Sequence, residues 1–278
     1  MGWTLVAAAC LVLLGSRGGL AVRINNLLVP PTVRTNSDKP VILDCDYTLK
    51  QGEDGLVVKW FFNNTPAPVY QWIPGQRPQE LGILKGRLNL NYEASDNHVT
   101  KHRALYIVNP TTDLTGEYKC FVSTFNDEDF MTKKMVVFAE GRNFEFSQQR
   151  KPDEDSMNIS CRAEALYPEP KMVLYKDTGS KDKKAVEGAL VHTWLRDGLF
   201  GINATKALRD DELQSPTMFD CELHIPDANY VVKKSLVYYP GLDQPTSVGS
   251  PTTHWSASPT AGSHLPVSPA DGGRVAEV

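Results

Sequence analysis

Cysteines are the residues whose spacing in this sequence points most directly to chemistry. Besides Cys10 near the start, the chain holds Cys45, Cys120, Cys161 and Cys221. Paired thiols form disulfides or, together with histidine, hold zinc, but no two of these cysteines stand in a CxxC-type spacing. A single histidine, His224, three positions after Cys221, is too little for a metal site. We therefore expect disulfides, with three possible pairings, and no metal.

The first 21 residues resemble a secretory signal. An apolar stretch runs from Leu5 to Leu14, and small residues follow as far as Ala21. We expect residues 1–21 to be removed, which also removes Cys10 and leaves an even number of cysteines in an oxidising compartment. No later stretch reaches the length of a membrane span. We expect a secreted, extracellular mature chain without membrane insertion; whether an anchored isoform exists stays open.

Charge and motifs argue against several functions. The formal net charge is -4, and no run of Lys or Arg indicates nucleic acid as a partner. The sequence has no G-x-S-x-G elbow, H-E-x-x-H, phosphate loop or dinucleotide fingerprint. We predict no catalytic residues, no cofactor and no enzymatic activity.

The elements that position the cysteines are short β-rich runs separated by Gly, Pro, Asn and Asp. One series fills residues 22–139 and a second fills 143–240, with a short polar junction, EGRN, between them. Residues 241–278 are rich in Pro, Gly, Ser and Thr, so we expect a disordered tail, suited to O-glycosylation or to no function. The pattern predicts an all-β chain of two tandem sandwiches or barrels.

The first series carries the pattern of an immunoglobulin sandwich. Cys45 lies in an alternating run, and Trp60 and then Cys120 follow it at the intervals that this fold requires. In that fold a disulfide ties strand B to strand F, and the strand C Trp packs against it. Tyr118, two positions before Cys120, is then placed for a tyrosine corner, with Gly116 in the turn. The long interval between the cysteines leaves room for the extra strands of a variable-type domain, for which PVYQWIP and GRLNLNY are candidates.

The second series matches the pattern less well. The interval from Cys161 to Cys221 is shorter than that of the first series, which suits a constant-type sandwich. Phe219 stands where the corner tyrosine would be, and strand C has no Trp near Leu174. The place of Trp194 stays open. Each disulfide should stabilise its domain by roughly 3 to 5 kcal/mol in the chain-entropy model.

Three N-glycosylation sequons fit a secreted protein. They begin at Asn63, Asn158 and Asn203. Since Trp60 and Cys161 should point inward, strand alternation turns Asn63 and Asn158 outward, where a glycan is tolerated.

The outward residues of strands C and F form a candidate protein-binding face. Phe61 on strand C and Lys119 and Phe121 on strand F should share it, with Tyr70 or Trp72 of the next strand beside them. Exposed aromatic side chains rimmed by lysine are typical of protein-binding patches. A glycan, the second domain or a loop could cover them instead, and we favour the interface because three strands contribute aromatics.

These motifs resemble those of the Beaten path family of two-domain neuronal immunoglobulin proteins. The resemblance rests on LVVKWFF, PVYQW, LTGEYKC with Leu114 in place of the usual acidic residue, and ALYPEP, and it covers about residues 22–240. It implies that the first domain binds a cell-surface immunoglobulin partner, possibly of the Sidestep family, in axon guidance or synaptic specificity. The alternative is a soluble extracellular protein with an immune or carrier role and no specific receptor.

Overall fold

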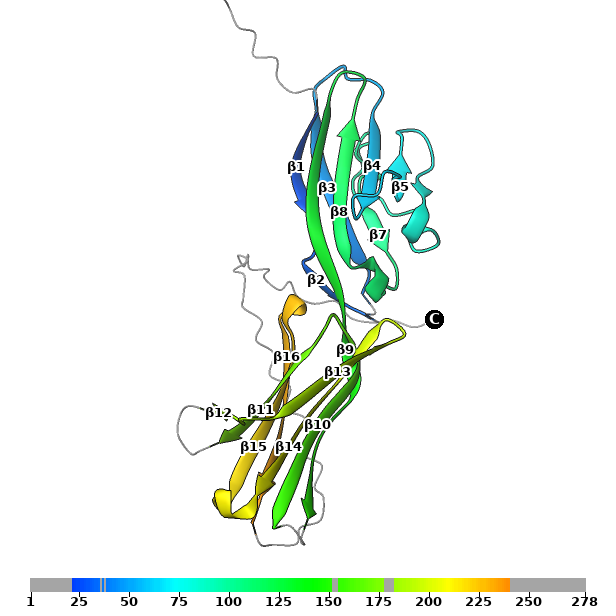
Figure 1. Ribbon diagram of the computed structural model, residues 1–278. Coiled ribbons are helices and arrows are strands. Elements are labelled where there is room, and N and C mark those ends of the chain that lie inside the picture. The colour runs from blue at the N-terminus through cyan, green and yellow to red at the C-terminus, as the bar shows by residue number, and fades with distance from the viewer. Residues whose placement is uncertain (1–21, 36, 38, 152–154, 178–182, 241–278) are drawn as a thin grey trace, which may run out of the picture.

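The computed structural model describes residues 22–35, 37, 39–151, 155–177 and 183–240. These residues fold into two β-sandwiches arranged end to end, with the cysteine-bearing strands inside each (Figure 1). The two tandem sandwiches predicted from the sequence are confirmed. The predicted signal segment 1–21 and tail 241–278 lie outside the described residues.

The first sandwich has the strand order of a variable-type domain. One sheet has the order β1-β3-β7, and the other contains β6-β5-β4-β8-β9. The short strand β2 pairs in parallel with β9. The bounds are β1 Val22–Leu28, β2 Thr32–Arg34, β3 Val41–Leu49, β4 Val57–Phe62, β5 Tyr70–Trp72, β6 Gln79–Glu80, β7 Leu105–Ile107, β8 Gly116–Ser123 and β9 Glu128–Lys151, with short 3-10 turns η1 Gly82–Leu84 and η2 Thr112–Leu114.

Alternation along the strands builds the core between these sheets. In β3, every second side chain from Val41 to Tyr47 is buried, and the intervening ones are partly exposed. Cys45 of β3 is bonded to Cys120 of β8, so the disulfide joins the two sheets. Trp60 of β4 lies directly opposite Cys120 and is fully buried.

The turn before β8 is held by a tyrosine corner. The Tyr118 hydroxyl donates a 2.8 Å hydrogen bond to the Leu114 carbonyl. Leu114 is itself fully buried. The acidic residue of this turn is Asp113, one position earlier, and its carboxylate lies 2.9 Å from the Arg87 guanidinium. Leu114 therefore packs in the core at the position where an acidic residue is usual, and the ion pair with Arg87 is made by Asp113, one residue earlier.

The segment GRLNLNY, predicted as a candidate for an extra strand, does not form a strand of the β6-β5-β4-β8-β9 sheet. PVYQWIP contains β5, but the last strand of this sheet is β6, so GRLNLNY does not extend it. Leu88 instead forms an isolated bridge with Ile107 beside the opposite sheet. Its partial burial against the core explains the placement.

The second sandwich has a constant-type arrangement. Its sheets have the orders β13-β14-β10-β9 and β12-β11-β15-β16. The bounds are β10 Ser156–Tyr167, β11 Lys171–Asp177, β12 Lys184–Ala185, β13 Leu190–Arg196, β14 Leu199–Arg209, β15 Thr217–Ile225 and β16 Tyr230–Tyr238, with 3-10 turns η4 Asp210–Glu212 and η5 Pro226–Ala228.

The second disulfide packs without an indole. Cys161 of β10 is bonded to Cys221 of β15, and Leu174 lies opposite Cys221. Phe219 is fully buried at the position of the corner tyrosine. The turn at η4 is held from another strand, because the Tyr238 hydroxyl lies 2.6 Å from an Asp210 carboxylate oxygen.

A single strand connects the two sandwiches. The polar segment EGRN was predicted as a junction, but β9 continues through it and pairs with β10 on the other side (Figure 1). Gly141 has φ +85, and the register shifts between Arg162 and Glu164 of the neighbouring strand. The junction is thus a bulged strand rather than a loop, because pairing with β10 continues beyond the shift, with Arg142 opposite Glu164 and Glu140 opposite Leu166.

A candidate protein-binding face on the first domain

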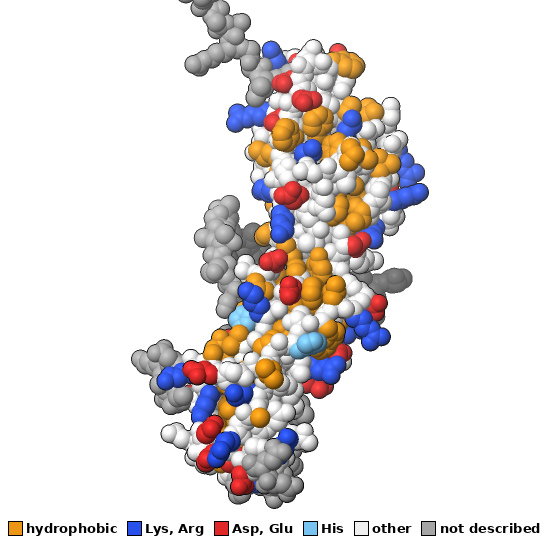
Figure 2. Space-filling model, viewed as in Figure 1, with side chains coloured by type: hydrophobic (Ala, Val, Ile, Leu, Met, Phe, Trp, Pro, Cys, Tyr) orange, Lys and Arg blue, Asp and Glu red, His pale blue; other side chains and the backbone are white. Residues whose placement is uncertain are grey.

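Four side chains form what we call the aromatic face, on the outer side of sheet β9-β8-β4. They are Phe61, Lys119, Phe121 and Phe130. Pairing explains their common side, because directly opposite residues of neighbouring strands point the same way. Phe61 lies opposite Lys119, and Phe121 lies opposite Phe130. Figure 2 shows hydrophobic side chains over this part of the molecule with Lys and Arg side chains among them.

The aromatic face is internally ordered. The rings of Phe61 and Phe121 meet edge to face, with centroids 6.3 Å apart. The Lys119 ammonium lies 4.8 Å from the Phe61 ring centroid and 5.9 Å from that of Phe130. Phe130 is 59% exposed, whereas Phe61 and Phe121 are partly buried. A lysine held between rings has little freedom left to lose on binding, which favours association.

Tyr70 and Trp72 do not belong to this face, and the prediction that one of them would be exposed beside it is wrong. Each is only 2% exposed. The register decides the matter, since Tyr70 lies opposite the buried Trp60 and Trp72 opposite the buried Val58. The outward residue of β5 is Gln71.

The buried aromatic residues instead anchor the segment 92–104. Three of them donate hydrogen bonds to backbone carbonyls of this segment: Tyr47 to Val99, Trp60 to Arg103 and Tyr70 to His102. Burial raises the pKa of Tyr70, so its phenol stays protonated and remains a donor. The Trp72 ring meets the His102 ring edge-on at 5.5 Å. These side chains are structural.

Phe130 was missed from the sequence. It lies near the start of β9, which begins at Glu128. Extending the alternation backwards from the buried Met135 and Val137 would have placed Phe130 on the outer side.

A further exposed aromatic lies at the loop end of the same domain. Phe125, between β8 and β9, is 81% exposed, and its backbone N–H donates to the Asp54 carbonyl. A Cβ at Gly55 would come within 2.5 Å of the Phe125 ring, so only glycine permits this close approach.

The three sequon asparagines all reach the surface. Asn63 is exposed at the end of β4, and its side-chain oxygen accepts a hydrogen bond from the Glu117 N–H. Asn158 and Asn203 are partly exposed on the outer side of sheet β13-β14-β10-β9. The Ser160 hydroxyl lies 3.2 Å from the Asn203 side-chain oxygen.

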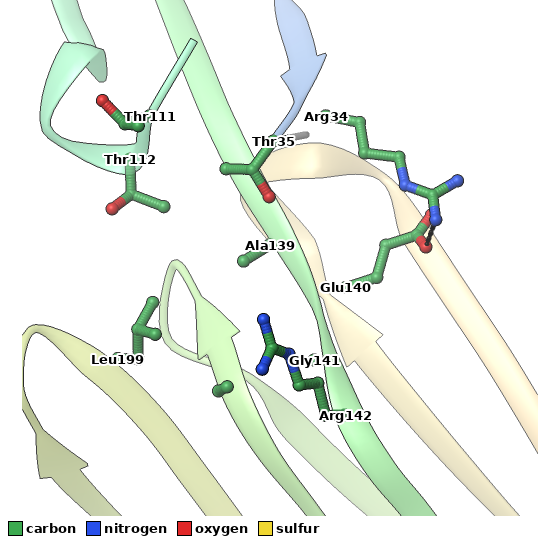
Figure 3. A pocket seen from close by; sticks show the side chains of 10 residues that line it. Arg34, Thr35, Thr111, Thr112, Ala139, Glu140, Gly141, Arg142 and Leu199 are labelled. Carbon is green, nitrogen blue, oxygen red and sulfur yellow. Dashed lines mark ion pairs between the residues drawn. The ribbon is translucent and has the colours of Figure 1, made fainter. Parts of the chain in front are cut away.

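The junction between the domains holds a pocket of about 410 Å³, seen in Figure 3. Arg34 and Glu140 form an ion pair at one side, and Thr111, Thr112 and Leu199 lie at the other. Its lining residues include no histidine or cysteine. Among the described residues, no group of three His, Cys, Asp or Glu side chains is placed to hold a metal. Within the same residues, no helix is long and apolar enough to span a membrane.

Comparison with known proteins agrees with the fold. No family model matches the sequence. Mouse butyrophilin subfamily 2 member A2 is 26% identical over 178 residues, which are 63% of this chain. The chain spans about a third of the length of that relative, 33%. The crystal structure of bovine butyrophilin superposes with a TM-score of 0.55 at 16% identity, covering 77% of this chain and 97% of the other.

The chain has the immunoglobulin-like fold, as two tandem β-sandwiches. The extracellular portion of mouse CD200RLa (TM-score 0.47, 14% identity, 75% of this chain and 96% of the other) is also similar. So is the ectodomain of mouse nectin-like molecule 4 (TM-score 0.46, 12% identity, 74% and 64%). None of these similarities points to the Beaten path family in particular.

Proposed function

We propose that this immunoglobulin-domain protein is an extracellular, non-enzymatic recognition protein that binds another cell-surface immunoglobulin protein through the aromatic face. The observation that carries the proposal is the exposure of Phe130 beside the Phe61–Phe121 pair. The Lys119 ammonium lies near the rings of both Phe61 and Phe130. Three adjacent strands contribute large aromatic groups to one open sheet surface. Such residues are enriched among those that dominate binding energy at protein interfaces.

The chemistry of the face defines its partner. Phe130 offers an apolar anchor that a shallow hydrophobic pocket would bury. The Lys119 ammonium donates hydrogen bonds but accepts none, so the partner should present a carboxylate or carbonyl oxygen opposite it. We expect a partner surface that is apolar at its centre and acidic beside it.

The Beaten path resemblance supports a narrower form of the proposal. In that form the partner is a Sidestep-type protein and the process is axon guidance or synaptic partner choice. The motifs LVVKWFF and LTGEYKC, on which the resemblance rests, supply both strands that carry Phe61 and Phe121. Neuronal expression would favour this interpretation, and expression as a circulating body-fluid protein would favour the alternative, an immune or carrier role without a specific receptor.

A binding screen tests the proposal. The full chain is expressed with its own N-terminal residues 1–21 as the secretory signal. The secreted protein is then applied to cells that display immunoglobulin ectodomains, including Sidestep-type ones. The variants Phe61→Asp, Phe121→Asp and Phe130→Asp should each weaken binding to a positive cell at least ten-fold, as expected for central interface aromatics. The matched control is Leu28→Asp, because Leu28 is 53% exposed but lies on β1 in the other sheet.

Two results would contradict the proposal. Binding unchanged by all three aromatic variants would exclude the face, provided that the variants are secreted at the level of the wild type. Absence of binding to every displayed immunoglobulin ectodomain would exclude this class of partner and leave the alternative.

A further inference from the structure

The outer strand of the second domain has an unusual composition for a sheet edge. Among the strands that the structure describes, β13 pairs with β14 alone, so its other side carries unpaired backbone groups. Natural edge strands usually carry a charged side chain, a proline or a β-bulge, which prevents pairing with another chain. From Leu190 to Leu195, β13 has no Lys, Arg, Asp, Glu or Pro, and its register with β14 is continuous, without a bulge. The edge strand β16 of the opposite sheet, by contrast, carries Lys233 and Lys234.

Large apolar side chains are exposed along this edge. Leu190 is 75% exposed, Val191 50% and Leu195 62%. The outer side of the strand also carries His192 and Trp194, whose rings stack with centroids 5.7 Å apart. Figure 2 shows hydrophobic side chains gathered on this side of the second domain as well.

The Trp194 ring is fixed in place by its neighbours. A Cβ at Gly201 would come within 2.2 Å of the ring, so the indole lies directly on the backbone of β14. The Arg162 guanidinium carbon lies 5.4 Å from the ring centroid. Beyond β13, the hairpin turns at Asp197 and Gly198, both with positive φ as a tight two-residue turn requires. The edge is therefore an ordered surface that loses little freedom on association.

The sequence of β13 is self-complementary about its centre. In an antiparallel pair of two copies related by a two-fold axis at Thr193, Val191 of each copy lies opposite Leu195 of the other. His192 lies opposite Trp194 in the same register. Around the axis, the register thus pairs apolar with apolar and ring with ring, and at each end Leu190 lies opposite the long side chain of Arg196. The two Arg196 side chains fall at opposite ends of the pair, about 20 Å apart, and do not repel each other.

We propose that two copies of this chain associate through β13, edge to edge and antiparallel. The interface is isologous, with the same strand used on both sides. At roughly 100 Å² from each of five side chains per copy, the pair buries on the order of 1,000 Å² in total, the lower limit for a specific interface. We expect a reversible dimer with a dissociation constant in the micromolar range.

The geometry has a consequence for the first domains. A two-fold axis of an antiparallel strand pair stands perpendicular to the sheet, so the two chains run in opposite directions. In each copy, β9 carries one sheet through both domains (Figure 1). The aromatic faces of the two copies therefore lie at the far ends of the proposed dimer. A bivalent dimer of this kind gains avidity towards a surface that displays many partners.

A charge-swap experiment tests the proposal on the full secreted chain by sedimentation equilibrium. Val191→Lys and Leu195→Glu should each raise the dissociation constant at least ten-fold, because each places a charge opposite an apolar side chain. Mixing the two variants should restore the dimer, since the introduced lysine then faces the introduced glutamate while the remaining Leu195 faces Val191.

A cysteine placed on the two-fold axis gives an independent readout. Thr193→Cys should form a covalent dimer under oxidising conditions, because opposite Cα atoms of an antiparallel pair lie about 4.5 to 5.5 Å apart, within disulfide range. The control is Val231→Cys. Val231 is 49% exposed and lies on β16, the edge strand of the other sheet, so this variant should stay monomeric. The proposal would be overturned by a wild-type chain that stays monomeric, or by a mixture of the two charged variants that does not form dimers.

Discussion

Removal of the Tyr118 hydroxyl isolates one buried hydrogen bond of the first domain. Tyr118 is fully buried, and its hydroxyl is 2.8 Å from the Leu114 carbonyl oxygen. Burial raises the pKa of Tyr118, so the phenol is protonated and donates throughout the range in which the protein folds. Tyr118→Phe keeps the ring, which lies 5.1 Å from the Phe62 ring, and deletes only the donor.

The expected loss of stability depends on the Leu114 carbonyl, which Tyr118→Phe leaves buried without a donor. A neutral hydrogen bond contributes about 1 kcal/mol, and a buried carbonyl left without a donor costs about 1 to 3 kcal/mol. The turn's own hydrogen bonds use the carbonyls of Thr111 and Thr112, so Leu114 gains no substitute from them. From the middle of that range, we expect Tyr118→Phe to lower the free energy of unfolding of the first domain by about 2 kcal/mol.

Guanidinium unfolding followed by tryptophan fluorescence measures this change. Trp60 and Trp72 report on the first domain and Trp194 on the second. With a denaturant slope of about 4 kcal/mol/M, the first transition should move down by about 0.5 M while the second stays in place.

The matched control is Tyr106→Phe. Tyr106 is partly exposed, and no hydrogen bond of its hydroxyl is found among the described residues. Its loss should change stability by no more than about 0.5 kcal/mol. Equal midpoints for Tyr118→Phe and Tyr106→Phe would refute the assignment of the tyrosine corner as a stabilising bond.

Two further predictions concern acid stability and glycosylation. Burial of Asp220 alone would raise its pKa, but hydrogen bonds from Lys183 and Ser235 and the Lys233 charge outweigh it and lower the pKa. The stabilisation is therefore present above the unfolded pKa of about 4 and is lost as pH falls through the lowered value. Asp220→Asn should flatten the loss of second-domain stability with acid, measured by thermal unfolding across that window; an unchanged slope would contradict it. The sequons at Asn63, Asn158 and Asn203 should each carry a glycan, so each Asn→Gln variant should lose one step in mass that glycosidase treatment also removes, and a wild-type mass insensitive to the enzyme would exclude all three.

The fold of each domain was largely readable from local sequence. Alternation around Cys45 and Cys120, with Trp60 between them, requires two facing sheets joined by a disulfide, and the structure contains that bridge. The reason is physical: a period of two fixes which face of a strand is buried, and a disulfide must lie where both faces meet. The same reasoning placed Phe61, Lys119 and Phe121 outward, as the structure has them.

The errors arose where the outcome depends on pairing between segments. The direction of Tyr70 and Trp72 depends on their register with β4, which two short strands joined by a loop do not specify on their own. Likewise, the sequence indicated a junction at EGRN but not its conformation, and pairing with β10 makes it part of a strand.

The sequence by itself determined two disulfide-bonded immunoglobulin sandwiches and the outward position of Phe61 and Phe121, because strand periodicity and cysteine spacing are local properties. Only the tertiary structure decided that Tyr70 and Trp72 are buried, because their direction depends on pairing with β4. Only the tertiary structure also left β13 at an open edge, since which strand ends a sheet depends on the order of strands in space. A strand such as LVHTWLR has the same sequence pattern whether it lies in the middle of a sheet or at its edge.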